Sequence, residues 1–113
     1  MIYKKSWKYI LIRDDSYWCN CYSYVYHIKA VKNFSNISFG DLGGYLERYY
    51  NLSQKGDCWV YDNSLVRDYA RVSENAKIYD YARAYDNAHI YGNAVVGNNS
   101  VISGDTQVYD DII

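Results

Sequence analysis

The chain has 113 residues and a mass of 13.3 kDa, which is the size of a single domain. Half of the residues are hydrophobic, 19% are aromatic and 22% are charged, and this composition excludes a disordered chain. No run of about 18 apolar residues is present, which excludes a membrane-spanning helix. The net charge of −1 combines two unlike halves, because residues 1–57 carry eight Lys/Arg against five acids and residues 58–113 carry four against eight.

The N-terminal sequence and the cysteines bear on the compartment. The segment 1–7 (MIYKKSW) has neither the apolar core nor the small-residue cleavage site of a signal peptide. Three cysteines, an odd number, do not make a disulfide framework. We therefore expect the protein in a reducing cytoplasm.

Residues 1–57 are predicted to form a small β-rich cap. Segments 6–13 (SWKYILIR) and 21–31 (CYSYVYHIKAV) are rich in aromatic and aliphatic residues and predict two strands, joined by a polar turn around residues 14–16 (DDS). Residues 40–44 (GDLGG) predict another turn, and residues 51–57 (NLSQKGD) lead into the regular repeat. Leu42 lies 18 residues before Val60, so we expect an irregular coil to begin there.

A repeat of six residues begins at Cys58 and continues without a gap through nine hexads to Asp111. The fifth and sixth positions are almost all Asp, Asn, Gly or Tyr. A helix does not fit this pattern, because a period of six does not keep one face apolar at 3.6 residues per turn. The first position is always small: Cys58, Ser64, Ala70, Ala76, Ala82, Ala88, Ala94, Ser100 and Thr106. The third position is β-branched in every hexad except that of Ala84: Val60, Val66, Val72, Ile78, Ile90, Val96, Ile102 and Val108.

Each hexad predicts a short strand followed by a corner. Positions one and three point inward and positions two and four outward, as strand alternation requires. Positions five and six turn the chain, since Asp, Asn and Gly tolerate left-handed backbone angles. Three hexads close one triangular coil, and nine hexads make three coils that pair by parallel β hydrogen bonds. The expected inner columns are Val60/Ile78/Val96, Val66/Ala84/Ile102 and Val72/Ile90/Val108.

The predicted fold is therefore all-β: a parallel β-helix of about three regular coils over residues 58–111, preceded by the cap at 1–57. Residues 112–113 form a tail. Its two isoleucines are expected to be exposed on the last coil, unless they fold over it or meet a partner.

The stretch from Tyr24 to Val72 resembles a family of small hexapeptide-repeat proteins common in phages and prophages. The similarity lies in YVYHIKAVKNF, GDLGGYLE and NLSQKGDCWVYDN, followed by small-x-Val hexads, and it covers roughly residues 22–111. The resemblance implies left-handed coils and a phage ancestry. Relatives carry labels such as transferase hexapeptide or polymer-forming protein, which leave the activity open because a fold does not determine a function.

Many left-handed β-helix proteins are acyltransferases, and this likeness makes His89 a candidate general base. His89 occupies hexad position two and is expected to point outward between Arg71 and Gln107 of neighbouring coils. The alternative is a solvated surface histidine, which we favour because a single titratable group without placed partners carries little information. The hexads also contain no protruding loop to build an acceptor site. We predict no catalytic residue and no cofactor, with His89 as the alternative.

Cys19, Cys21, Cys58 and His27 are the residue types that ligate zinc. The C-x-C spacing is unusual for a zinc site, and Cys58 occupies a small inward position of the repeat. We therefore expect packed thiols plus one surface cysteine, and no metal site.

The outer surface carries tyrosines and acids in register from coil to coil. Stacked carboxylates about 4.8 Å apart repel one another, and a basic partner would relieve this repulsion. The alternative is a solvated surface in which neighbouring Lys and Arg side chains offset the acids. Tyrosine is enriched in protein interfaces, which favours a binding face. The predicted partner-binding residues are the acids Asp62, Asp80, Asp68, Asp86 and Glu74, together with Tyr61, Tyr79, Tyr85, Tyr91 and Tyr109.

The predicted function is a non-enzymatic, phage-type interaction module that binds a host protein or nucleoprotein complex, with an anti-CRISPR-like inhibitor of a host defence complex as the hypothesis. The alternatives are an acyltransferase using His89 and a self-assembling structural phage component. A homodimer and a homotrimer both fit the pattern. Direct nucleic-acid binding through Lys4, Lys5, Lys8 and Arg13 is less favoured because the basic excess of residues 1–57 is small. No membrane partner is expected.

Overall fold

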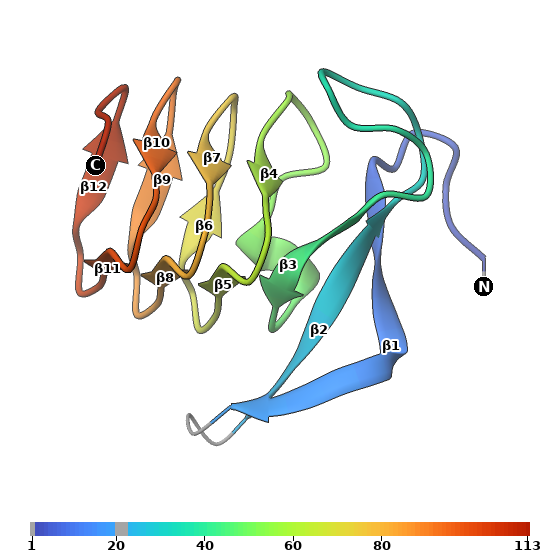
Figure 1. Cartoon of the computed structure of the whole chain (residues 1–113), viewed down its shortest axis with the longest axis horizontal. Helices are drawn as coiled ribbons and strands as arrows, with labels where there is room; N and C mark the ends of the chain where they lie inside the picture. Colours follow the sequence, from blue (N-terminus) through green and yellow to red (C-terminus); the bar gives the residue numbers. More distant parts are fainter. Residues whose placement is uncertain (1, 20–22) are drawn as a thin grey trace.

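The computed structural model describes residues 2–19 and 23–113, and it confirms the all-β fold. Figure 1 shows stacked coils running from β4 to β12, with the β1–β2 hairpin projecting from the N-terminal end of the stack. The coil strands pair in parallel across three faces, giving the sheet orders β3-β5-β8-β11, β4-β7-β10 and β6-β9-β12. The first of these sheets continues into β2 and β1, so the cap and the solenoid share one six-stranded sheet.

The regular strands are short, as six-residue edges require. They are β4 (Trp59–Val60), β5 (Leu65–Val66), β6 (Arg71–Val72), β7 (Lys77–Ile78), β8 (Arg83–Ala84), β9 (His89–Tyr91), β10 (Val95–Val96), β11 (Val101–Ile102) and β12 (Gln107–Tyr109). Residues 111–113 add to β10, where the N–H of Val95 donates to the carbonyl of Asp111 at 2.8 Å and Ile112 forms a parallel bridge to Val95.

The hairpin consists of β1 (Tyr9–Cys19) and β2 (Ser23–Ala30), paired antiparallel. The predicted turn at residues 14–16 is wrong, because β1 continues through it as a bulge. The register moves from Leu11 opposite Ile28 to Ser16 opposite Tyr26, so β1 carries three more residues than β2 between these pairs. The polar segment leaves the ladder locally, and the aromatic residues after it resume pairing.

The strand β3 (Leu42–Leu46) lies where residues 40–44 predict a turn, so that prediction is wrong beyond Asp41. A Cβ on Gly43 would stand 2.6 Å from the carbonyl oxygen of Val60, and one on Gly44 would stand 2.4 Å from that of Ser64. The two glycines therefore serve the close approach of β3 to the first regular coil.

An irregular coil does precede the first hexad, but Leu42 is not its inner residue. Leu42 is exposed, whereas the buried Leu46 pairs with Val66 and Leu52 bridges to Val72. The turn η1 (Tyr49–Asn51) lies between Leu46 and Leu52. Val60 follows Leu52 by eight residues, whereas the hexad spacing would give six. These two extra residues shift the irregular coil out of register with the hexads.

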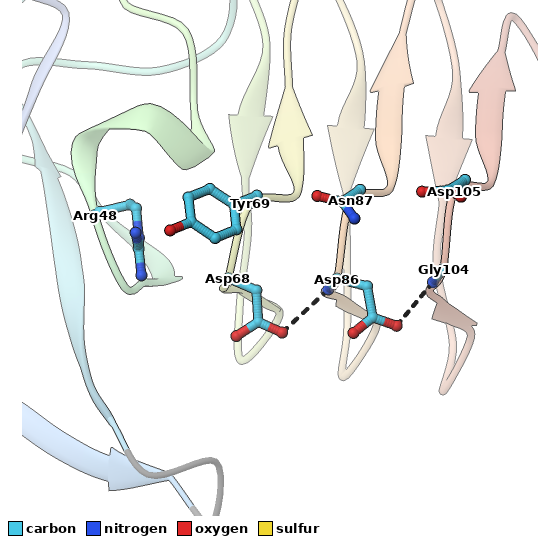
Figure 2. Close-up of a pocket in the computed structure, with 7 residues that line it drawn as sticks. All are labelled: Arg48, Asp68, Tyr69, Asp86, Asn87, Gly104 and Asp105. Carbon is cyan, nitrogen blue, oxygen red and sulfur yellow. Dashed lines mark hydrogen bonds between the residues drawn. The ribbon is translucent and has the colours of Figure 1, made fainter.

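The corners hold their residues in left-handed backbone conformation, as the hexad pattern predicts. Position five has a positive φ in all nine corners, near 56–66°. Figure 2 shows the corner of Asp68, Asp86 and Gly104, where each carboxylate reaches the backbone N–H of the next coil.

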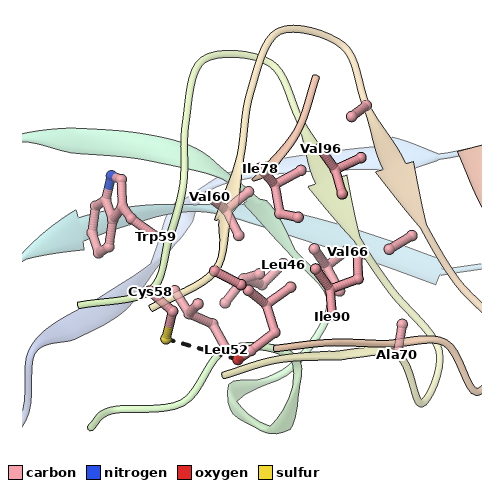
Figure 3. Close-up of a cluster of buried hydrophobic side chains, with 14 of the residues drawn as sticks. Leu46, Leu52, Cys58, Trp59, Val60, Val66, Ala70, Ile78, Ile90 and Val96 are labelled. Atoms are coloured by element: carbon pink, nitrogen blue, oxygen red, sulfur yellow. Dashed lines mark hydrogen bonds between the residues drawn. The ribbon is translucent and has the colours of Figure 1, made fainter. Parts of the chain in front are cut away.

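All three inner columns are confirmed by the strand registers. Figure 3 shows Val60, Ile78 and Val96 in a row inside the coils, and every third-position residue is at most 8% exposed. Trp59 points away from this row, at an outward position of the first coil. The rings of Tyr9 and Phe34 cover Trp59, so the cap continues the core of the solenoid. Among the described residues, no helix has the length and apolar character needed to cross a membrane.

Candidate functional site

The stacked corner acids are hydrogen-bonded within the fold. A carboxylate oxygen of Asp62 accepts from the N–H of Asp80 at 3.0 Å, and Asp80 accepts from the N–H of Asn98 at 2.8 Å. Asp68 and Asp86 repeat this arrangement at the next corner, with distances of 3.1 and 2.9 Å. These N–H groups offset the repulsion between stacked carboxylates, so the acids do not require a basic partner to be stable.

The third corner holds Glu74 and Asp110, with Gly92 between them in the stack. Both acids have a positive φ, 59° for Glu74 and 60° for Asp110. The carboxylate of Asp110 accepts from the N–H of Asn93 at 2.8 Å. Asp110 thus bonds the preceding coil at a sixth position, whereas the acids of the other two corners accept from a fifth-position N–H of the following coil.

The tyrosines at hexad position four stack along the coils. The rings of Tyr61 and Tyr79 lie 4.3 Å apart at 11°, and those of Tyr91 and Tyr109 lie 5.0 Å apart. Burial raises the pKa of Tyr61, whose hydroxyl contacts the side-chain oxygen of Asn36 at 3.1 Å. Tyr85 is covered by the guanidinium of Arg67 at 4.2 Å. Except for Tyr109, these rings are only partly exposed because they cover one another.

Tyr69, which the pattern does not single out, lines a hollow at one corner of the coils. The hollow has a volume of about 510 Å³, and we call it the Tyr69 hollow; its lining residues are Arg48, Asp68, Tyr69, Asp86, Asn87, Gly104 and Asp105. Figure 2 shows Arg48, Tyr69, Asn87 and Asp105 in a row across neighbouring coils. Tyr69 is 64% exposed. The signal that could have found it is tyrosine at a sixth position, which projects from a corner instead of lying on a face.

A network under the Tyr69 hollow holds Arg48 in place. The guanidinium of Arg48 lies 2.9 Å from the carboxylate of Glu47 and 4.9 Å from the ring centre of Tyr69. Glu47 also accepts from the N–H of Asp68 at 2.6 Å. Burial alone would raise the pKa of Glu47, but hydrogen bonds from the Ser23 hydroxyl, Asp68 and Arg48 outweigh it and hold this pKa below its usual value.

Tyr81 occupies the matching sixth position at a second corner and is 61% exposed. It lines two smaller hollows, of about 280 and 310 Å³, which share Tyr81 and Arg83. Leu65 lines one of them and Val101 the other, so this second surface is more apolar than the Tyr69 hollow.

His89 lies between Arg71 and Gln107, as the hexad register predicts. Its Nε2 is 3.0 Å from the hydroxyl of Ser73, and its ring stacks on Tyr91 with the centres 4.3 Å apart. Burial and the charge of Arg71 lower its pKa, against the opposing charge of Glu74. The lowered pKa favours the neutral imidazole, the form that a general base needs.

The candidate zinc ligands are only partly described. Cys21 and the side chain of Cys19 lie outside the described residues, while Nδ1 of His27 is 3.0 Å from the carbonyl oxygen of Gly43. Among the side chains that are described, no three of His, Cys, Asp and Glu gather closely enough to hold a metal ion.

No family model matches the chain. A stretch of 39 residues, 34% of the chain, is 36% identical to the uncharacterized acetyltransferase YdcK of Escherichia coli (strain K12). The matched stretch covers 12% of the length of that protein. This local similarity and the solenoid both fit a hexapeptide-repeat protein.

Proposed function

We propose that the protein is a non-catalytic binding module that recognises a partner protein through the Tyr69 hollow. The observation that carries this proposal is the pair of Tyr69 and Arg48. The ring of Tyr69 is largely exposed, and the guanidinium stacked on it is fixed by Glu47. Tyr and Arg dominate interface hot spots, and a side chain held in place before binding loses little conformational freedom on association.

The acids around the hollow favour a basic partner surface. Asp68, Asp86 and Asp105 outnumber the cations Arg48 and Arg67, of which Arg67 pairs with Asp68 at 2.9 Å, and Asp105 is exposed. The partner implied by the phage-type resemblance is a host protein or nucleoprotein complex, and inhibition of a host defence complex is one form of this proposal. Complementary charge would speed association and would make it sensitive to salt.

The test is affinity capture from a bacterial lysate with three purified forms of the tagged protein. Tyr69→Ala removes the ring in the hollow, and Tyr81→Ala is the matched control because it removes an equally exposed tyrosine at the same hexad position. We expect wild type and Tyr81→Ala to capture the same partner, and Tyr69→Ala to retain at least tenfold less.

Equal capture by all three forms would contradict a role for the Tyr69 hollow. A double variant, Asp62→Lys with Asp80→Lys, tests the other acidic corner. If this double variant no longer captures the partner while Tyr69→Ala still captures it, the binding surface lies at the corner of Asp62 and Asp80. Size-exclusion chromatography of the same samples reports whether the binding form is a monomer, dimer or trimer.

The second candidate is an acyltransferase that uses His89. The observation favouring it is the similarity to a protein named as an acetyltransferase, together with a neutral His89 within hydrogen-bond distance of Ser73. Binding of acetyl-CoA would raise the Tm of the protein, and His89→Ala would abolish acetyl transfer while leaving that Tm shift in place. Absence of a Tm shift at millimolar acetyl-CoA, with no transfer to an acceptor panel, would remove this candidate.

A further inference from the structure

Lys8 and Cys58 form a buried amine–thiol pair between the cap and the first coil. Both residues are 0% exposed, and the Nζ of Lys8 lies 3.3 Å from the Sγ of Cys58. The two residues are 50 positions apart in the sequence, so this contact joins the start of the cap to the start of the regular repeat. Neither residue belongs to the Tyr69 hollow or to the surroundings of His89.

The surroundings of Lys8 fix its Nζ next to the sulfur. Nζ donates to the carbonyl oxygen of Cys58 at 2.7 Å and to that of Gly56 at 3.2 Å. The backbone of Lys8 is also held, because its N–H donates to the side-chain oxygen of Gln54 at 2.6 Å. These hydrogen bonds hold both the backbone and the amine of Lys8, so the amine and the thiol keep one fixed geometry.

The buried position also changes the chemistry of the amine. Burial lowers the pKa of Lys8 and outweighs the charge and hydrogen bond of Cys58, which raise it; the charge of Lys77 acts in the same direction as burial. A lower pKa increases the fraction of neutral amine, which has the lone pair that a nucleophile requires.

The turn of residues 55–57 covers the pair and is itself exposed. Gly56 has a φ of +73°, and a Cβ there would stand 2.3 Å from the carbonyl oxygen of Glu74. Only glycine fits this tight turn, whose backbone carbonyls contact Nζ. The carbonyl oxygen of Lys55 in this turn also lies 3.6 Å from Sγ, so local opening of the exposed turn gives a small oxidant access to the thiol.

We propose that Lys8 and Cys58 are an oxidative cross-linking site, at which hydrogen peroxide joins Nζ to Sγ in a sulfenamide bond. In the first step the thiolate attacks one oxygen of peroxide, the O–O bond breaks, and the sulfur is oxidised by two electrons to a sulfenic acid; the departing hydroxide takes up the proton that the thiol released and leaves as water. In the second step the Nζ lone pair attacks the sulfur and the S–O bond breaks. The hydroxide leaves as a second water with a proton from nitrogen. A thiol reductant reverses the bond.

The cross-link would close a loop containing β1, β2 and β3, and so would fix the cap on the solenoid. A covalent link across a loop of this length restricts the unfolded chain strongly, and we expect the Tm of the oxidised protein to rise by about 10 °C.

The test uses the full chain with Cys19→Ser and Cys21→Ser, which leaves Cys58 as the single thiol and prevents any disulfide within one chain. After treatment with hydrogen peroxide, we expect the intact mass to fall by about 2 Da, in accordance with the loss of two hydrogens. Tryptic digestion should give one peptide containing both Lys8 and Cys58, with no cleavage after Lys8. Dithiothreitol should restore the original mass and the original Tm.

Lys8→Arg in the same background is the matched control, because it keeps a cation but has no primary amine. This variant should stop at the sulfenic acid, with a gain of about 16 Da, or continue to the sulfinic acid. The same oxygen adducts on the Lys8-containing protein, or an unchanged mass, would overturn the proposal. If Lys8→Arg does not fold, the linked tryptic peptide of the parent protein decides the result alone.

Discussion

A carboxylate oxygen of Asp68 accepts a hydrogen bond of 3.1 Å from the backbone N–H of Asp86, which stands at the same corner one coil further along. Asp86 in turn accepts from the N–H of Gly104 at 2.9 Å. Both aspartates have a φ near 60°, a conformation that Asp and Asn adopt more readily than other non-glycine residues. One residue type therefore turns the corner and hydrogen-bonds the next coil, which gives the corner acids a structural reason of their own.

The corner hydrogen bond predicts different outcomes for two substitutions at Asp86. Asp86→Ala loses the acceptor and retains the positive φ, so we expect it to lower the free energy of unfolding by about 1–2 kcal/mol. Asp86→Asn keeps a side-chain oxygen and tolerates the same φ, so we expect a loss of about 0.5 kcal/mol or less. Urea unfolding at pH 7 measures both values. Equal losses would show that the carboxylate charge, and not the acceptor geometry, stabilises the corner.

The regular coils could be predicted from the sequence because each hexad repeats the same local requirements. A small residue and a β-branched residue point inward, and a left-handed corner follows, so the register of Val60, Ile78 and Val96 depends only on counting. The irregular coil could not be counted in this way. Its inner residue is Leu46 instead of Leu42, because the cap contacts and the extra residues between Leu52 and Val60 replace the six-residue step.

The candidate site was predictable only in part, for a related reason. Position-four rings such as Tyr61 and Tyr79 are easy to identify from the repeat, but stacking covers them. Tyr69 projects from a corner, and its partner Arg48 comes from the irregular coil, where the repeat gives no position. The contact between Tyr69 and Arg48 could therefore be found only in the three-dimensional structure.

Glu47 should make stability depend on acid pH. Its pKa is lower in the folded chain than its ordinary value of 4.5 in the unfolded chain, so the folded state favours the ionised form. Ionised Glu47 therefore stabilises the fold above about pH 4.5, and this stabilisation is lost as the pH falls through the folded pKa. We expect the Tm of Glu47→Gln to fall less than that of wild type between pH 5 and pH 3. At pH 7 the substitution should lower the free energy of unfolding by about 1–2 kcal/mol.

A matched acid isolates this effect. Asp41 accepts a hydrogen bond from the N–H of Ser38 in an exposed turn and has no part in the Glu47 network. Asp41→Asn should leave the acid slope of the Tm close to that of wild type. If Glu47→Gln and wild type lose stability in parallel below pH 5, the network around Arg48 does not hold the carboxylate as described.

His89 should titrate below its ordinary pKa of 6.5. A histidine with a lowered folded pKa stabilises the fold above pH 6.5, and this contribution disappears as the pH falls, because the unfolded chain binds the proton more readily. NMR titration of the imidazole resonances measures this pKa directly. Arg71→Met removes a neighbouring positive charge and should move the pKa upward, while the resonances of His27 serve as the internal reference. An unchanged His89 pKa in that variant would exclude Arg71 as a contributor.

The interior of the solenoid should respond to truncation according to hexad position. Ile78 is fully buried between Val60 and Val96, in the middle of one inner column. Ile78→Ala leaves a cavity that short, hydrogen-bonded coils have little freedom to close, so we expect the free energy of unfolding to fall by about 3 kcal/mol. Ile78→Val removes one methylene and should cost about 1 kcal/mol. Val101→Ala truncates an outward side chain that is 55% exposed, and it should change the free energy of unfolding by about 0.5 kcal/mol or less. A loss at Ile78 as small as that at Val101 would contradict the tight packing of this inner column.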